Sequence, residues 1–200
     1  MHFQRQVNRM SKGYNILIVG VGGQGTLLTS RILGTVAINL KQDVKVSEVH
    51  GMSQRGGSVV TYVKFGETVN SPLIEAGETD VILAFELLEA YRWIKYLKKG
   101  GKIIVNCQRI DPMPVIMGKQ KYPEDIIDRL NELDLQIIPV DALCIAKSCG
   151  NIKAVNTVLL GVLAKHSGID KKIWIDSLKE NIKEKFIETN LKAFEAGYDL

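Results

Sequence analysis

The chain has 200 residues, of which 46% are hydrophobic and 24% charged, and its formal net charge is +4. These values are typical of a globular protein with one sizeable core, and the mild, dispersed basic charge predicts no nucleic-acid partner. No apolar run reaches the roughly 20 residues of a membrane span, which predicts no membrane partner. Because the first residues lack the apolar core of a signal peptide, we expect a disordered lead-in at 1–14, followed by a single domain at 15–200.

The first predicted element is a strand at 16–19, an unbroken apolar run typical of a strand buried on both faces of a parallel sheet. A glycine-rich turn follows, and then an amphipathic run that predicts a helix from Thr26 towards Asn39. Gly34 within this helix predicts close packing against the sheet. Strand, turn and helix together satisfy G-x-G-x-x-G in its required context, so backbone N–H groups could face a phosphate or carboxylate. The glycines of the turn are Gly20, Gly22, Gly23 and Gly25.

A second glycine-rich loop, 51–58, separates the strands expected at 44–49 and 59–65. Arg55 precedes two glycines in it, which places a planar cation beside backbone that an anion can approach closely. In an open α/β sheet, loops at the carboxyl ends of neighbouring strands share one crevice, so we expect both loops to line one site. The alternative interpretation is an arginine paired with a nearby acid on a surface hairpin.

Short apolar runs then alternate with helical patterns as far as Val140, and helical patterns alone follow. Strands are expected at 80–85, 102–106 and 136–140, and helices at 86–97, 123–133, 141–148, 156–167 and 171–186. Lys98 to Gly101 is interpreted as a helix end, and Asp141 and Asn156 as N-caps. This order predicts a three-layer α/β/α sandwich with a largely parallel, Rossmann-like sheet and a helical C-terminal part.

Apart from the two loops, the sequence offers no self-sufficient catalytic constellation. His50 adjoins the second loop, but a lone histidine is more often structural than catalytic. Glu86 and Glu89 stand one helical turn apart and are interpreted as a solvated face. We therefore predict no catalytic residue and no metal ligand in this chain. The three cysteines have no C-x-x-C spacing and are expected to be free cytoplasmic thiols: Cys107, Cys144 and Cys149.

Three segments resemble the gamma-type subunit or domain of the 2-oxoacid:ferredoxin oxidoreductases: Gly20 to Thr26, Glu48 to Ser58 and Asn156 to Gly161. The resemblance extends over about residues 15–182. The form Glu-Val-His-Gly-Met-Ser-Gln-Arg-Gly-Gly is most similar to the small beta subunit of the indolepyruvate:ferredoxin branch.

The resemblance implies a subunit that is inactive alone and binds no cofactor by itself. Thiamine diphosphate and iron–sulfur clusters would lie in the partner subunit, where a 2-oxoacid loses CO2, electrons pass to ferredoxin, and the acyl group passes to coenzyme A as co-substrate. Carried over to this sequence, both glycine loops would bind ligand or face the partner subunit. Their residues are Gly20, Gly22, Gly23, Gln24, Gly25, Thr26, His50, Ser53, Gln54, Arg55, Gly56 and Gly57.

Two other functions stay open on the residues alone. The first is a stand-alone Rossmann-type enzyme that binds NAD(P), FAD or ATP, because Glu48 stands about where a ribose-binding acid is expected. The second is a non-catalytic interaction domain that docks through the helices after Val140. A homodimer of the isolated chain is a further alternative.

Overall fold

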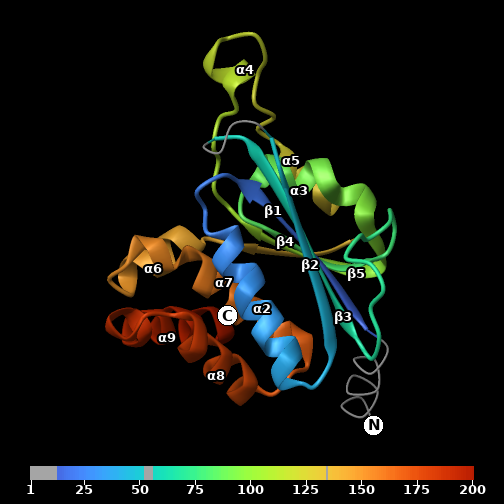
Figure 1. The fold of residues 1–200 in the computed structure, drawn as a ribbon. Coiled ribbons are helices and arrows are strands. Elements are labelled where there is room, and N and C mark those ends of the chain that lie inside the picture. The colour runs from blue at the N-terminus through green and yellow to red at the C-terminus, as the bar shows by residue number, and fades with distance from the viewer. Residues whose placement is uncertain (1–12, 52–55, 134) are drawn as a thin grey trace.

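The computed structural model describes residues 13–51, 56–133 and 135–200, and its centre is a six-stranded sheet of order β2-β3-β1-β4-β5-β6 (Figure 1). β1, β4, β5 and β6 pair in parallel, as predicted, whereas β3 runs antiparallel to both β1 and β2. The strands are β1 (Tyr14–Val21), β2 (Asp43–His50), β3 (Ser58–Gly66), β4 (Thr79–Ala84), β5 (Leu97–Asn106) and β6 (Gln136–Val140).

The antiparallel direction of β3 follows from the length of the connection that precedes it. The connection 51–57 is too short for the crossover that a parallel pair requires, so β2 and β3 pair as a hairpin. β3 thereby lies between β1 and β2. In the classic dinucleotide-binding order, the second strand lies directly beside the first. The sheet is thus Rossmann-like in its parallel half and departs from that fold at the hairpin.

Helices cover both faces of the sheet, which confirms the predicted three-layer sandwich (Figure 1). Alternate residues of β1 point to opposite faces, so Ile16 and Ile18 belong to one core, and Leu17 and Val19 to the other. The helices packed on the first core are α2 (Thr26–Asn39), α6 (Ala142–Ser148), α7 (Val155–Ser167), α8 (Lys171–Asn181) and α9 (Glu184–Tyr198). Those on the second are α3 (Leu87–Trp93) and α5 (Ile126–Asn131). The remaining elements are α4 (Met113–Ile116), η1 (Ile94–Tyr96) and η2 (Ile152–Ala154).

Two predicted boundaries were wrong. Lys98 to Gly101 does not end a helix but lies inside β5, where the pairing with β4 shifts register and Gly100 has a φ of 76°. A left-handed glycine serves a bulge as well as it serves a helix cap, so the pattern was ambiguous. The helix predicted at 171–186 is two helices, since the backbone is extended at Ile182 and Lys183. That break carries neither glycine nor proline, and α9 then packs back along α7.

Close helix packing occurs at glycines other than the predicted one. A Cβ at Gly161 of α7 would lie 2.1 Å from the carbonyl oxygen of Phe194 in α9. A Cβ at Gly197 of α9 would lie 2.1 Å from the carbonyl oxygen of Val158. The two helix backbones are therefore in direct contact. At Gly34 no described atom lies within 4 Å of the same position, so the predicted close packing there was wrong. In the described ranges, every helix is too short or too polar to cross a membrane.

Candidate functional site

The first glycine loop, 22–25, joins β1 to α2 at the carboxyl edge of the parallel strands (Figure 1). Gly23 and Gly25 have φ values of 102° and 88°, a left-handed conformation that other residues rarely adopt. Among the described residues, no side chain caps the start of α2, and its first turn contains no acid. The first N–H groups of α2 therefore keep their positive partial charge for an anion.

Gln24 has a different role from its glycine neighbours. Its Oε1 accepts a hydrogen bond from the Val21 N–H at 2.7 Å, and its Nε2 donates to the Phe85 carbonyl at 2.9 Å. The amide of Asn106 donates to the same carbonyl at 3.1 Å. Gln24 thus ties the loop to the end of β4, and its side chain is engaged within the protein. No local sequence pattern indicates this role, because the partner carbonyl lies 61 positions away.

The two glycine loops meet directly. The Gly22 N–H donates to the Gly57 carbonyl at 2.9 Å, because the start of the antiparallel β3 pairs with the end of β1. The next residue, Ser58, donates its hydroxyl to Glu89 Oε2 at 2.6 Å, and Glu89 Oε1 accepts from Arg92 at 2.6 Å. The start of β3 is thereby fixed to α3. Ser53, Gln54 and Arg55, which the sequence places at the centre of the second loop, lie outside the described residues.

A cavity of about 420 Å³ opens beside the first loop and the end of β2. Exposed Glu48 accepts a hydrogen bond from the Thr61 hydroxyl at 3.0 Å, and His50 Nδ1 lies 3.2 Å from the Gly51 carbonyl oxygen. No described lining residue pairs a nucleophile with a base. The cavity offers a ligand the backbone N–H groups of the glycine loop, and beside them the carboxylate of Glu48 and the imidazole of His50. Its lining residues are Gly22, Gly23, Gly25, Thr26, Leu27, Glu48, His50 and Val59.

Glu86 and Glu89 are buried, so their interpretation as a solvated face was wrong. They are 1% and 2% exposed. Glu86 Oε1 accepts hydrogen bonds from the Tyr122 hydroxyl at 2.5 Å and from the Ile110 N–H at 3.1 Å. Its Oε2 accepts from the Glu89 N–H, so that Glu86 is the N-cap of α3. Burial, and then this bond to Glu86, raises the pKa of Tyr122. Helical spacing identifies a shared face but not what covers it, and here the segment after β5 covers Glu86.

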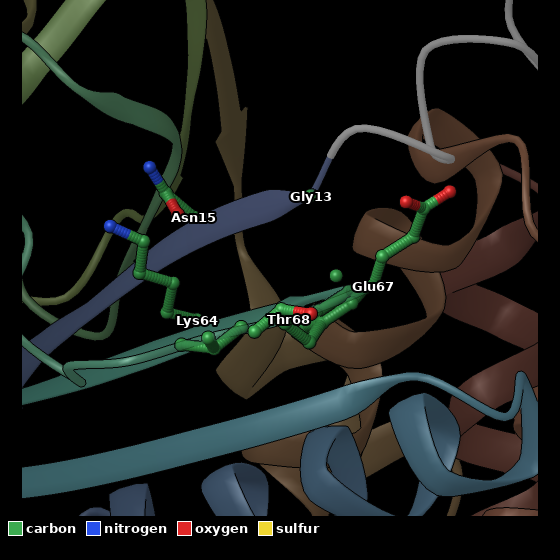
Figure 2. A pocket seen from close by; sticks show the side chains of 8 residues that line it. Gly13, Asn15, Lys64, Glu67 and Thr68 are labelled. Carbon is green, nitrogen blue, oxygen red and sulfur yellow. The ribbon is translucent and has the colours of Figure 1, made fainter.

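A second cavity, of about 610 Å³, lies at the opposite end of β1 and contains none of the predicted site residues (Figure 2). Figure 2 shows Asn15 and Lys64 at one end of it and Glu67 at the other. The Asn15 amide donates to the Glu78 carbonyl at 3.0 Å. This cavity begins at Gly13, next to residues that the structure does not describe, and we assign it no ligand.

Possible metal ligands do not gather within the described ranges, where no three His, Cys, Asp or Glu side chains form a metal-binding group. Cys107 and Cys144 are exposed and Cys149 is partly buried, all three as free thiols. Although Cys107 as a residue is exposed, partial shielding of its sulfur from water raises the pKa of the thiol, which disfavours the reactive thiolate.

The chain is similar to known proteins over most of its length. The pyruvate ferredoxin/flavodoxin oxidoreductase family model matches residues 15–200. The indolepyruvate oxidoreductase subunit IorB of Thermococcus kodakarensis is 42% identical over 93% of this chain and 95% of its own length. The ketoisovalerate oxidoreductase subunit VorA of Methanothermobacter marburgensis is 30% identical over 92% of this chain but only 36% of its own length.

The fold is also that of a solved structure. The gamma subunit of a keto/oxoacid ferredoxin oxidoreductase from Geobacter sulfurreducens superposes with a TM-score of 0.69. The alignment covers 93% of this chain and 96% of that one, at 23% identity. With a family match over nearly the whole described sequence, this chain belongs to the pyruvate ferredoxin/flavodoxin oxidoreductase family.

Proposed function

We propose that this chain is the small subunit of a cytoplasmic 2-oxoacid:ferredoxin oxidoreductase of anaerobic metabolism, whose substrate is indolepyruvate or another aryl pyruvate. The observation that carries the proposal is the 42% identity to an indolepyruvate oxidoreductase subunit over nearly the full length of both chains. The identity to the ketoisovalerate oxidoreductase subunit is lower, at 30%. That difference favours the indolepyruvate branch.

The chemistry divides between subunits in this proposal. Thiamine diphosphate and iron–sulfur clusters in the partner subunit supply oxidative decarboxylation of the 2-oxoacid, with electrons passing to ferredoxin and the acyl group to coenzyme A. This chain supplies the carboxyl edge of its sheet, where a ligand-sized cavity lacks a catalytic relay among its described residues. In this proposal, a partner subunit that carries the cofactors completes the ligand-binding surface.

The glycine loops are the proposed contact with ligand or partner. The backbone at Gly23 and Gly25 and the uncapped start of α2 suit the phosphates of coenzyme A or a substrate carboxylate. Leu27 and Val59 add apolar surface to the same cavity. Arg55 extends this proposal to the second loop, where a guanidinium would bind the anion in a bidentate manner.

An arm that projects from the same edge of the molecule is the proposed partner contact. The arm is residues 107–125, with α4 at its tip (Figure 1). Met113, Ile116 and Met117 near the tip are 60%, 66% and 57% exposed, while the base is held by the bonds to buried Glu86. Between 112 and 122 the sequence has basic residues, Lys119 and Lys121, but no acid. We propose that the arm enters an apolar groove with an acidic rim on the partner subunit.

A longer relative supports a protein partner for this surface. This chain corresponds to only 36% of the ketoisovalerate subunit that it matches, so in that relative a homologous segment is covalently joined to further polypeptide. In the proposed complex, a separate subunit takes that place. The stand-alone nucleotide enzyme has less support. Glu48 lines the glycine-loop cavity, but β3 separates its strand from β1, unlike in the classic dinucleotide-binding order, and the Thr61 hydroxyl donates to its carboxylate.

Purification of the tagged chain from its native anaerobic cytosol tests the proposal. We expect a larger thiamine-diphosphate-containing protein to co-purify and the eluate to reduce a viologen dye with aryl pyruvates. A chain that elutes alone and binds NAD(H) or ATP would contradict it. In the assembled enzyme, Arg55→Ala should raise the KM for coenzyme A or the 2-oxoacid, with Arg31→Ala as the control. If both KM values stay unchanged, Arg55 does not bind ligand.

A further inference from the structure

Residues 156–161 form a motif of the sequence that the proposed function leaves without a role. Asn156 lies in the first turn of α7, and Gly161, at the other end of the motif, contacts α9. Asn156 was predicted as an N-cap, but α7 already begins at Val155, so that role was wrong. The residue is only 4% exposed. Burial of a polar amide costs free energy unless polar contacts compensate, so the contacts of Asn156 indicate its role.

The side chain of Asn156 lies against Gly25, the residue of the first glycine loop that directly precedes α2. A Cβ at Gly25 would lie 3.2 Å from Asn156 Nδ2, 3.5 Å from its Cγ and 3.7 Å from its Cβ. The amide therefore occupies the side of the Gly25 backbone on which any other residue would carry its side chain. Gly25 is thus required for two independent reasons, its φ of 88° and this contact from α7.

Buried hydrogen bonds fix the orientation of this amide. Asn156 Oδ1 accepts from the Thr157 N–H at 3.0 Å, which turns the Nδ2 end of the amide towards Gly25. The Thr157 hydroxyl donates to Asn190 Oδ1 at 2.7 Å, and Asn190 Nδ2 donates to the Phe186 carbonyl at 2.9 Å. Because Asn156, Thr157 and Asn190 are all buried, water competes little for these bonds. The amide is therefore held rigidly from α7 and α9.

Gly25 in turn sets the position of the first turn of α2. Its carbonyl accepts from the Thr29 N–H and from the Thr29 hydroxyl, each at 3.1 Å. Gly25 and Thr26 also line the glycine-loop cavity. A shift of Gly25 would therefore move the N–H groups that are available to an anion there. Binding geometry is sensitive to such shifts, since a misplacement of about 1 Å can cost about a hundredfold in rate.

We propose that Asn156 is a positioning residue of the glycine-loop site: it fixes Gly25 and thereby the first N–H groups of α2, which receive the anionic group of the ligand. The inference rests on the proposed function, in which this loop binds coenzyme A or the 2-oxoacid. Asn156 is not among the lining residues of the cavity, so it acts on the ligand through Gly25. A neutral amide suits this place, because a carboxylate against the same loop would repel the anion.

Steady-state kinetics of the complex with its partner subunit test this role, with viologen reduction as the assay. Asn156→Asp keeps the oxygen that accepts from Thr157 but replaces the amide nitrogen beside Gly25 by a carboxylate oxygen. We expect the KM of coenzyme A or of the 2-oxoacid to rise about tenfold or more, with a smaller change in kcat. The substrate whose KM rises is the one whose anion the loop receives. If neither KM changes, the inference is wrong.

Asn190→Asp is the matched control for a merely structural effect. It also keeps the oxygen that accepts from Thr157, but it sets a carboxylate against the Phe186 carbonyl, away from the glycine loop. This variant should lower Tm, because a buried donor is replaced by a charged acceptor. Both KM values should stay at their wild-type level. An equal rise of KM in the two variants would attribute the effect to lost stability and would overturn the positioning role.

Hydrogen exchange of the full chain tests the contact without turnover. Asn156→Ala removes the side chain that lies against Gly25, so the Thr29 amide, which donates to the Gly25 carbonyl, should exchange about tenfold faster than in the wild type and in Asn190→Asp. Equal exchange in all three would show that Asn156 does not fix Gly25, and would leave the oxidoreductase function intact. A complex without 2-oxoacid activity would instead contradict the proposed function, and the exchange rates would still decide whether Asn156 fixes the loop.

Discussion

The turn from β1 into α2 and the contact between α7 and α9 both depend on glycine, but for different reasons. In the first, Gly23 and Gly25 adopt φ values near +100° and +90°, so the requirement lies in the local backbone. In the second, Gly161 and Gly197 allow two helices to touch, so the requirement lies in a partner more than thirty positions away. A local requirement leaves a motif in the sequence, whereas a packing requirement leaves an isolated glycine in a helix.

The largest expected effect is a loss of stability when a glycine at the contact between α7 and α9 is replaced by alanine. Gly161→Ala would place its Cβ 2.1 Å from a backbone carbonyl of α9, and the helices must separate to accept it. We expect a loss of about 3 kcal/mol or more in the free energy of unfolding, measured by urea denaturation. Gly34→Ala is the matched control, since it is also inside a helix but meets no described atom within 4 Å. It should gain about 0.5–1 kcal/mol. Equal effects of the two variants would disprove the close contact.

The next effect tests whether the glycine loop is held by Gln24 rather than by its glycines alone. Gln24→Glu removes the donor to the Phe85 carbonyl and sets a carboxylate against that oxygen. We expect a loss of about 2 kcal/mol and faster amide exchange at Gly22 and the start of α2. Gln120→Glu, an exposed glutamine in the arm, should change neither quantity. Unchanged exchange in the loop would show that Gln24 is not the anchor.

A smaller effect is expected at the proposed partner contact, which leaves the fold intact. Ile116→Ser at the tip of the arm should weaken binding to the partner subunit roughly tenfold, because burial of its side chain would be lost. Ile38→Ser is the control, since Ile38 is similarly exposed, at 62% against 66%, but lies on α2. Surface-immobilised partner would report both dissociation constants. Equal values for the two variants would exclude the arm from the interface.

Features that depend on local sequence could be predicted, whereas features set by distant parts of the chain could not. The strand at 136–140 was placed at its observed bounds, and the strand at 16–19 within the observed β1, because continuous apolar runs report burial directly. The two glycine loops were expected to meet at the carboxyl ends of neighbouring strands, whereas they meet because the start of the antiparallel β3 pairs with the end of β1. The break at Ile182 and the burial of Glu86 were missed, since α7 and the segment after β5 impose them from a distance.

The smallest expected effect concerns the stability contributed by His166, in the last turn of α7. Burial, and then the charges of Lys102 and Lys165, lowers its pKa below the ordinary 6.5. Between that lowered pKa and about pH 6.5 the unfolded chain binds more protons than the folded one, so stability is full above this window and is lost as the pH falls through it. His166→Gln should remove this part of the slope of Tm with pH, while changing Tm little at about pH 8. Thermal unfolding of wild type and variant at about pH 8 and pH 5.5 would show it. If Tm of the variant falls as much on acidification as that of the wild type, protonation of His166 does not destabilise the fold. Carboxylates elsewhere would then account for the decrease of Tm with pH.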